Sequence, residues 1–147
     1  MANLRTMRRP RSIAVAVVAV LVVIQFKPVT RDNPPVRNEI SASPEIMAIV
    51  TRACYDCHSN ETEWPWYSHV APISWFVAGH VAEGREHLNF SEWPAFDMDE
   101  QEHLFEEMEK EVEDKEMPLK SYLILHPDAR LTPDDRQTLL RWIRADP

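Results

Sequence analysis

The two cysteines of the chain, Cys54 and Cys57, are separated by two residues, and His58 follows directly. The resulting Cys-Tyr-Asp-Cys-His is the CxxCH pattern of c-type haem attachment. The spacing suits this chemistry, because two thiols on one helical turn reach two vinyl groups of a single porphyrin while the adjacent imidazole meets the iron from the same side. We therefore predict one covalent haem c held by Cys54 and Cys57, with His58 as the proximal iron ligand.

Three other interpretations of the cysteine pair stay open: a structural disulfide, a thioredoxin-like redox pair and half of a zinc site. An exported chain can carry such a disulfide. A redox pair normally belongs to a βαβ context, and no strand pattern precedes Cys54. Zinc would require further ligands, and the sequence has no second cysteine pair. Haem attachment is the interpretation that we prefer.

Haem iron in electron-transfer cytochromes usually takes a second protein ligand, and methionine raises the reduction potential relative to histidine. Met117 is the predicted distal ligand, because it precedes Pro118 in a short segment between an acidic helix and a later helix. A proline-stiffened loop there would press the sulfur onto the iron. The other candidates are His80, His87, His126, Met98 and Met108. An open sixth position is the remaining alternative.

The N-terminal segment has the layout of a signal peptide or a signal anchor. Four arginines precede a wholly apolar run from Ile13 to Ile24, and the residues after the run are not the small ones that a signal peptidase prefers. We therefore predict an uncleaved membrane anchor over residues 1–27. The run is shorter than the roughly 20 residues of a typical spanning helix, and Arg11 and Lys27 would extend it by snorkelling. The positive-inside tendency places the rest of the chain on the periplasmic side of a bacterial cytoplasmic membrane.

Residues 28–42 contain three prolines and no apolar period, which predicts a linker, and residues 43–147 are expected to form the haem c-binding domain. Its first helix should begin with Ser43 as the N-cap and Pro44 at the first helical position. We also expect an amphipathic helix within the acidic stretch 97–116 and a closing helix after Thr132. With only two glycines, tight β-hairpins are not expected. The predicted fold class is all-α.

The formal net charge of the chain is −8, although four of its 16 basic residues precede the apolar run. Removing these four leaves 12 basic residues against 24 acidic ones, so the remainder carries about −12. Nucleic acid is therefore not an expected partner. The acidic helix within 97–116 would favour a basic redox partner protein, while the simpler interpretation is a solvated helix face.

Several short sequence elements besides the CxxCH motif are similar to those of a known protein family. They are Cys-His-Ser-Asn-Glu-Thr at 57–62, Trp-Pro-Trp-Tyr at 64–67, Leu-Asn-Phe-Ser-Glu-Trp at 88–93, Met-Pro-Leu at 117–119, and the segment from Tyr122 to Pro127. In these elements the chain resembles the haem-binding domain family, a group of small bacterial proteins related to c-type cytochromes. The resemblance implies covalent haem c on an exported or anchored domain, with the motif histidine as proximal ligand and Met117 as distal ligand. By similarity to small cytochromes c, Trp142 of the last helix would meet the helix before Cys54.

The preferred function is that of a one-electron carrier rather than an enzyme, because two fixed axial ligands keep the iron geometry nearly constant. The alternative is a peroxidase-like haem enzyme or a ligand sensor whose sixth position is open or displaceable. Its polar residues would come from His80, His87 or Arg85. A third possibility is a module without haem, in which the cysteine pair forms a disulfide.

Overall fold

The computed structural model of the 147-residue chain describes residues 8–93 and 98–145, and these ranges contain helices and loops but no β-strand. The predicted all-α fold class is confirmed. Contacts divide the chain into two units. One comprises Met1–Arg31 and Trp64–Gly79, and the other comprises Asp32–Glu63 and His80–Pro147. Each unit is described separately below.

The first unit begins with helix α1 (Arg8–Val23), which continues into the 3-10 helix η1 (Ile24–Phe26). Its apolar side chains are exposed along the helix, from 46% at Leu21 to 69% at Val15. Within the described residues, no helix combines the length and the apolarity that crossing a membrane requires. Residues 1–7 of the predicted anchor lie outside the described part of the chain, and the anchor stays a prediction.

The segment after η1 is held by contacts within the first unit. The Gln25 side chain exchanges two hydrogen bonds with the backbone of Ala71, donating from Nε2 to O at 3.1 Å and accepting from N at 2.9 Å. The Lys27 ammonium lies 4.8 Å from the centroid of the Trp75 ring, which is a cation–π distance. These contacts connect the segment to the turn between η2 (Trp66–His69) and α4 (Ile73–His87) and to the first turn of α4.

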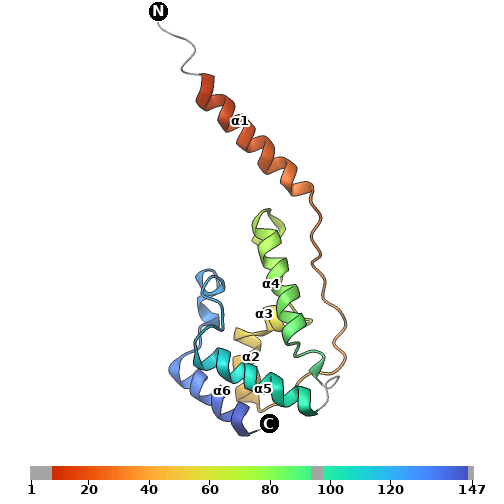
Figure 1. Ribbon diagram of the computed structural model, residues 1–147, viewed down its shortest axis with the longest axis vertical. Coiled ribbons are helices and arrows are strands. Elements are labelled where there is room, and N and C mark those ends of the chain that lie inside the picture. Colours follow the sequence, from red (N-terminus) through yellow and green to blue (C-terminus); the bar gives the residue numbers. More distant parts are fainter. Residues whose placement is uncertain (1–7, 94–97, 146–147) are drawn as a thin grey trace, which may run out of the picture. The chain divides into compact units, whose positions relative to one another are not determined.

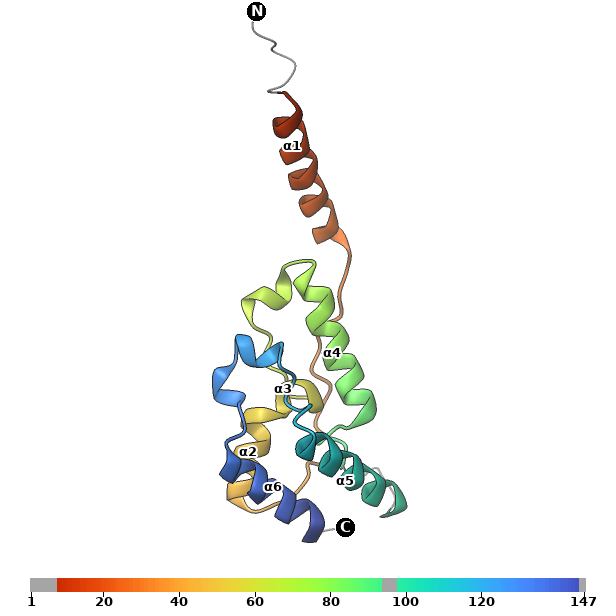
Figure 2. The same cartoon turned by 60° about the vertical axis from the view of Figure 1, so that its left-hand side comes forward.

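The core of the second unit is built from three helices, α2 (Pro44–Ala53), α5 (Met98–Glu113) and α6 (Pro133–Ala145). Helices α5 and α6 lie side by side, and α2 packs against α6 (Figures 1 and 2). The first and last helices of the predicted domain thus pack together, whereas the ring contact of Trp142 is with Phe105 of α5. The fully buried side chains with the largest volumes are Phe90, Leu139, Ile143 and Val50.

Helix α2 begins and faces the core as its sequence predicts. The Ser43 hydroxyl accepts a hydrogen bond from the backbone N–H of Ile46 at 3.4 Å, and Pro44 occupies the first helical position. The four apolar residues at helical spacing are all buried, namely Ile46, Ile49, Val50 and Ala53. Burial of this stripe stabilises the helix by the hydrophobic effect and carries the chain to Cys54 at the edge of the core.

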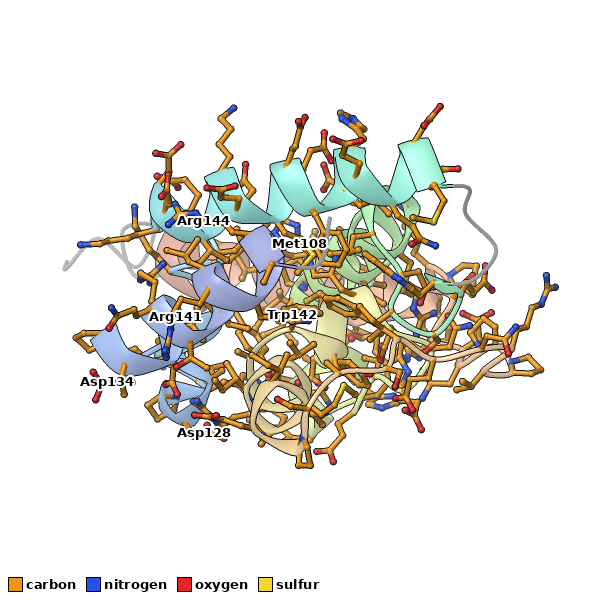
Figure 3. All side chains as sticks on the ribbon, turned by 90° about the horizontal axis from the view of Figure 1, so that it is seen from below. Met108, Asp128, Asp134, Arg141, Trp142 and Arg144 are labelled. Carbon is orange, nitrogen blue, oxygen red and sulfur yellow. The ribbon has the colours of Figure 1, made fainter. Side chains whose placement is uncertain are left out.

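Helices α5 and α6 also confirm their sequence patterns. The Thr132 hydroxyl accepts from the Asp135 backbone N–H at 3.0 Å, and the Asp135 carboxylate accepts from the Thr132 N–H at 2.9 Å, which forms a reciprocal cap at the start of α6. On α5, Phe105 is buried and meets the ring of Trp142 edge-on, with 5.5 Å between centroids. Arg144 and Trp142 of α6 lie beside α5 (Figure 3), and Arg144 forms ion pairs with Glu109 and Glu113 of α5.

The segment predicted as a linker lies along the second unit from Asp32 onwards. The Ile40 N–H donates to the Phe90 carbonyl at 3.0 Å, and the N–H groups of Arg37 and Asn38 both donate to the Ser91 carbonyl. The Ile40 side chain is 5% exposed and belongs to the core. Stable contacts therefore begin before residue 43. They were not predicted because a proline-rich segment docked through its backbone shows no apolar period.

Candidate haem site

The CxxCH motif folds as a tight turn at the end of α2. Helix α2 ends at Ala53, and the short helix α3 covers Tyr55–His58. The N–H groups of Cys57 and His58 both donate to the Cys54 carbonyl, at 3.1 and 2.9 Å. One turn of backbone thus brings both thiols and the imidazole to one end of α2, as the spacing predicts.

The imidazole of His58 is oriented by the segment that follows α4. Its Nδ1 lies 3.1 Å from the Leu88 carbonyl oxygen, and its own backbone carbonyl accepts from the Phe90 N–H at 2.8 Å. Burial lowers the pKa of His58 and favours the neutral ring. A neutral imidazole that donates from Nδ1 presents the lone pair of Nε2, which is the arrangement of a histidine that ligates a metal.

Helix α4 approaches the motif closely at Gly84. A Cβ atom placed on Gly84 would lie 2.6 Å from the Cys57 carbonyl oxygen, whereas a Cβ on Gly79 would meet nothing within 4 Å. A residue larger than glycine at position 84 would therefore push the helix away from Cys57. Gly84 thus lets α4 form one wall of the site.

A cavity of about 520 Å³ opens beside the motif, within the size range of small-molecule and cofactor sites. Cys54, Cys57, His58 and Met117 all line it, so the structure brings together the four predicted site residues. Other apolar side chains complete the wall: Leu88, Phe90, Leu104, Met108, Val112, Leu119 and Leu131. This lining suits a flat apolar macrocycle.

Met117 reaches the cavity through a sharp turn after α5. The backbone of Lys115 adopts the left-handed conformation, with φ of 59°, two residues beyond Glu113, the last residue of α5. The N–H groups of Glu116 and Met117 then both donate to the Glu111 carbonyl, at 3.1 and 3.3 Å. The chain is reversed there, and the side chain of Met117 lines the cavity with Pro118.

The other candidate ligands separate into two groups. His80, His87 and Met108 line the cavity, whereas Met98 and His126 do not, the former being 66% exposed and the latter stacking on Tyr122. Arg85 does not line the cavity either. Its guanidinium donates to the Ser59 carbonyl and the Thr62 hydroxyl, both at 2.8 Å. It therefore braces the loop after the motif.

A hydrogen bond that the sequence did not predict connects the motif to the Met117 loop. The Tyr122 hydroxyl donates to the Asp56 carboxylate at 2.6 Å, and both residues line the cavity. The other carboxylate oxygen accepts from the Glu63 N–H at 3.0 Å. Nothing local to Asp56 or Tyr122 indicates this pairing, because the two positions are 66 residues apart.

The chemical state of the thiols bears on the rival interpretations. Both cysteines are free in the structure. Burial raises the pKa of Cys54 to about 12 and that of Cys57 to about 11, whereas a redox pair depends on a lowered pKa. Across residues 8–93 and 98–145, no three His, Cys, Asp or Glu side chains are grouped to hold a metal ion. The raised thiol pKa values thus differ from those of a thioredoxin-like redox pair.

Two thiols, an oriented imidazole and a thioether line one largely apolar cavity, and these are groups that can hold a haem. Comparison with known proteins agrees with this geometry. The family model of the haem-binding domain matches residues 19–145. No curated protein and no solved structure matches the chain significantly. The match spans most of the sequence, and the chain belongs to the haem-binding domain family.

Proposed function

We propose that this protein is a c-type cytochrome that carries single electrons outside the cytoplasmic membrane of a bacterium. Cys54 and Cys57 hold one haem c through thioether bonds, His58 is the proximal iron ligand, and Met117 is the distal ligand. The observation that carries the proposal is that these four side chains line a single cavity although Met117 lies far from the motif in sequence.

When bound, the haem supplies the reversible one-electron chemistry of its iron. The protein contributes orientation and exclusion of water. The Leu88 carbonyl orients the imidazole of His58, and the turn at Lys115 brings Met117 to the cavity from a different part of the fold. A largely apolar wall disfavours net charge at the iron and so raises the reduction potential of the haem. A methionine ligand raises this potential as well.

Ligation on both sides favours electron transfer over catalysis, because a filled sixth position leaves no site for a substrate. The alternative function is a haem enzyme or ligand sensor with a displaceable sixth ligand. It is favoured by one observation, that His80 and His87 of α4 line the same cavity and would supply polar groups beside a bound ligand.

The proposed location rests on the first unit. Helix α1 exposes apolar side chains along its length, which is unfavourable in water and favourable in a lipid environment. The arginine-rich start would stay in the cytoplasm and residues after Lys27 would lie outside. Mass spectrometry of the mature protein tests this proposal, which predicts an intact N-terminal segment. A chain cut downstream of Phe26 would contradict it.

Two methionine variants test the distal ligand. Met117→Ala should abolish the ferric near-infrared charge-transfer band of a methionine-ligated haem and convert the spectrum towards high-spin iron. Met108→Ala is the matched control, because Met108 lines the same cavity and is predicted not to ligate. An unchanged band in Met117→Ala would refute the assignment, and loss of the band only in Met108→Ala would transfer the role to Met108.

A further inference from the structure

A second pocket, of about 610 Å³, lies between the Met117 loop and α6. Its charged lining is entirely basic and consists of Lys115, Lys120, Arg130, Arg136, Arg141 and Arg144. Leucine and proline side chains, including Pro118 and Leu140, form its apolar part. A concave site lined by apolar side chains and by cations has the composition of a docking site for an anionic group.

This concentration of positive charge contrasts with the rest of the chain. Six of the 16 basic residues line the one pocket, although the net charge is −8. Lys120 and Arg144 form ion pairs with glutamates. The other four have no carboxylate partner within 4.0 Å among the described residues, so no acidic side chain there neutralises them. Two of them form hydrogen bonds with neutral groups: Arg136 with the Val112 carbonyl, and Arg141 with the Gln137 carbonyl and the Thr138 hydroxyl.

The basic pocket also adjoins the candidate haem site. Met117, Pro118 and Leu131 line both the pocket and the 520 Å³ cavity, so the two are separated by the thickness of these side chains. A molecule bound at the basic pocket would therefore lie directly behind the proposed distal ligand.

We propose that the basic pocket docks an acidic redox protein, which exchanges one electron with the haem iron across the wall formed by Met117, Pro118 and Leu131. This inference rests on the proposed function. One electron moves from the reduced partner to ferric iron, or from ferrous iron to the oxidised partner, and no atom or proton is transferred. The guanidinium group of arginine binds a carboxylate with two parallel hydrogen bonds, which orients the partner as well as attracting it. The proposal differs from the basic partner that the acidic stretch 97–116 suggested.

Binding is tested with hexaglutamate peptide and the full chain in neutral detergent, measured by fluorescence anisotropy. The side chains of Arg130 and Arg141 are exposed and make no ion pair, so charge reversal there should leave the fold intact. We expect Arg130→Glu combined with Arg141→Glu to weaken binding about tenfold or more, and wild-type binding to weaken as salt increases.

Arg37→Glu serves as the control for net charge, because Arg37 is exposed and lies outside the pocket. Arg37→Glu combined with Arg11→Glu matches the charge change of the double variant, and Arg11 is also exposed and lines neither cavity. Equal weakening in both double variants would overturn the proposal, since net charge would explain the binding. Failure of hexaglutamate to bind would overturn it as well. Binding of hexalysine instead of hexaglutamate would also overturn it, because the partner would then be basic and would bind the acidic helix α5.

Electron transfer is measured on the haem-loaded protein by stopped-flow oxidation with ferricyanide, an anion, and with a cationic cobalt(III) complex. Reversal of Arg130 and Arg141 should slow the anionic oxidant about tenfold and leave the cationic one unchanged or faster. Peptide binding without any effect on oxidation would contradict the electron route. A chain that carries no covalent haem would refute the proposed function, and the peptide result would then refute or support the docking site independently.

Discussion

The phenol of Tyr122 donates a 2.6 Å hydrogen bond to the carboxylate of Asp56, the residue that immediately precedes the second cysteine of the CxxCH motif. Tyr122 follows Met117 in the same loop, and its N–H donates to the Leu119 carbonyl at 3.0 Å. Asp56 is itself held, because its carbonyl accepts from the Thr62 hydroxyl at 2.9 Å. The bond therefore connects the haem attachment site to the loop that carries the proposed distal ligand.

Removing this bond should loosen the Met117 loop. A hydrogen bond to a charged group contributes about 1.5–3 kcal/mol, so Tyr122→Phe should raise the affinity of the ferric protein for added imidazole by about tenfold to a hundredfold. The measurement is a spectrophotometric imidazole titration.

Tyr55→Phe is the matched control for this titration. The Tyr55 hydroxyl donates to Glu39 at 2.7 Å, a bond of the same chemistry, but Tyr55 does not line the cavity. We expect wild-type imidazole affinity for this variant. Equal changes in both variants would indicate a general loss of stability instead of a specific effect on the loop.

The close approach at Gly84 predicts a large effect from one added methyl group. Gly84→Ala places a Cβ 2.6 Å from the Cys57 carbonyl oxygen, and overpacking of this kind costs about 1–3 kcal/mol. Chemical denaturation should show this loss, and the yield of attached haem should fall. Gly79→Ala, in the same helix with open space around it, should be neutral or stabilising by up to about 1 kcal/mol. Equal stability of the two variants would argue against the contact.

The raised pKa values of the two thiols predict slow alkylation of the folded, haem-free, reduced protein. With pKa values of about 12 for Cys54 and about 11 for Cys57, few thiolates exist at pH 8. Iodoacetamide should therefore react about a hundredfold or more slowly than with an unperturbed cysteine of pKa near 8.5. Mass spectrometry of quenched samples measures the rate. Rapid alkylation at neutral pH would instead support the redox-pair interpretation.

The cap of α6 predicts a loss of stability in acid. Hydrogen bonds from Thr132, followed by the guanidinium of Arg52 at 2.9 Å, lower the pKa of Asp135 in the folded state. Its contribution is therefore present above the unfolded pKa near 3.9 and is lost as the pH falls through the folded value. Asp135→Asn should cost about 1 kcal/mol at pH 7.

The difference between wild type and Asp135→Asn should shrink as the pH is lowered below about 4. Asp134→Asn is the control, since Asp134 occupies the same helical turn and shares its dipole effect. Urea unfolding at a series of pH values measures both variants. A difference that stays constant down to pH 2 would show that the carboxylate charge of Asp135 is not involved.

Features that depend on neighbouring residues were predictable from the sequence. The caps at Ser43 and Thr132 predicted where α2 and α6 begin, and the apolar spacing predicted which face of α2 is buried. The CxxCH spacing likewise predicted that Cys54, Cys57 and His58 share one turn. Each of these patterns spans only a few positions, so local geometry determines it.

Features that depend on distant residues were not predictable. The Asp56–Tyr122 bond and the docking of residues 32–42 join parts of the chain with no shared periodicity. The basic pocket could not be predicted from the sequence either, because its cations are spread over residues 115–144. The turn at Lys115 and helix α6 bring them together. Gly84 did carry a usable indication, since a glycine inside a helix costs about 1 kcal/mol relative to alanine and often marks close packing.

The most direct test of the proposed function is a pyridine haemochrome spectrum of the full chain, expressed with the cytochrome c maturation machinery and extracted with acid acetone. We expect a c-type band that survives extraction from the wild type. Cys54→Ser or Cys57→Ser should give a shifted band with one thioether, and replacement of both cysteines should leave no retained haem. Haem that extracts from the wild type, or no haem at all despite active maturation, would contradict covalent attachment at Cys54 and Cys57.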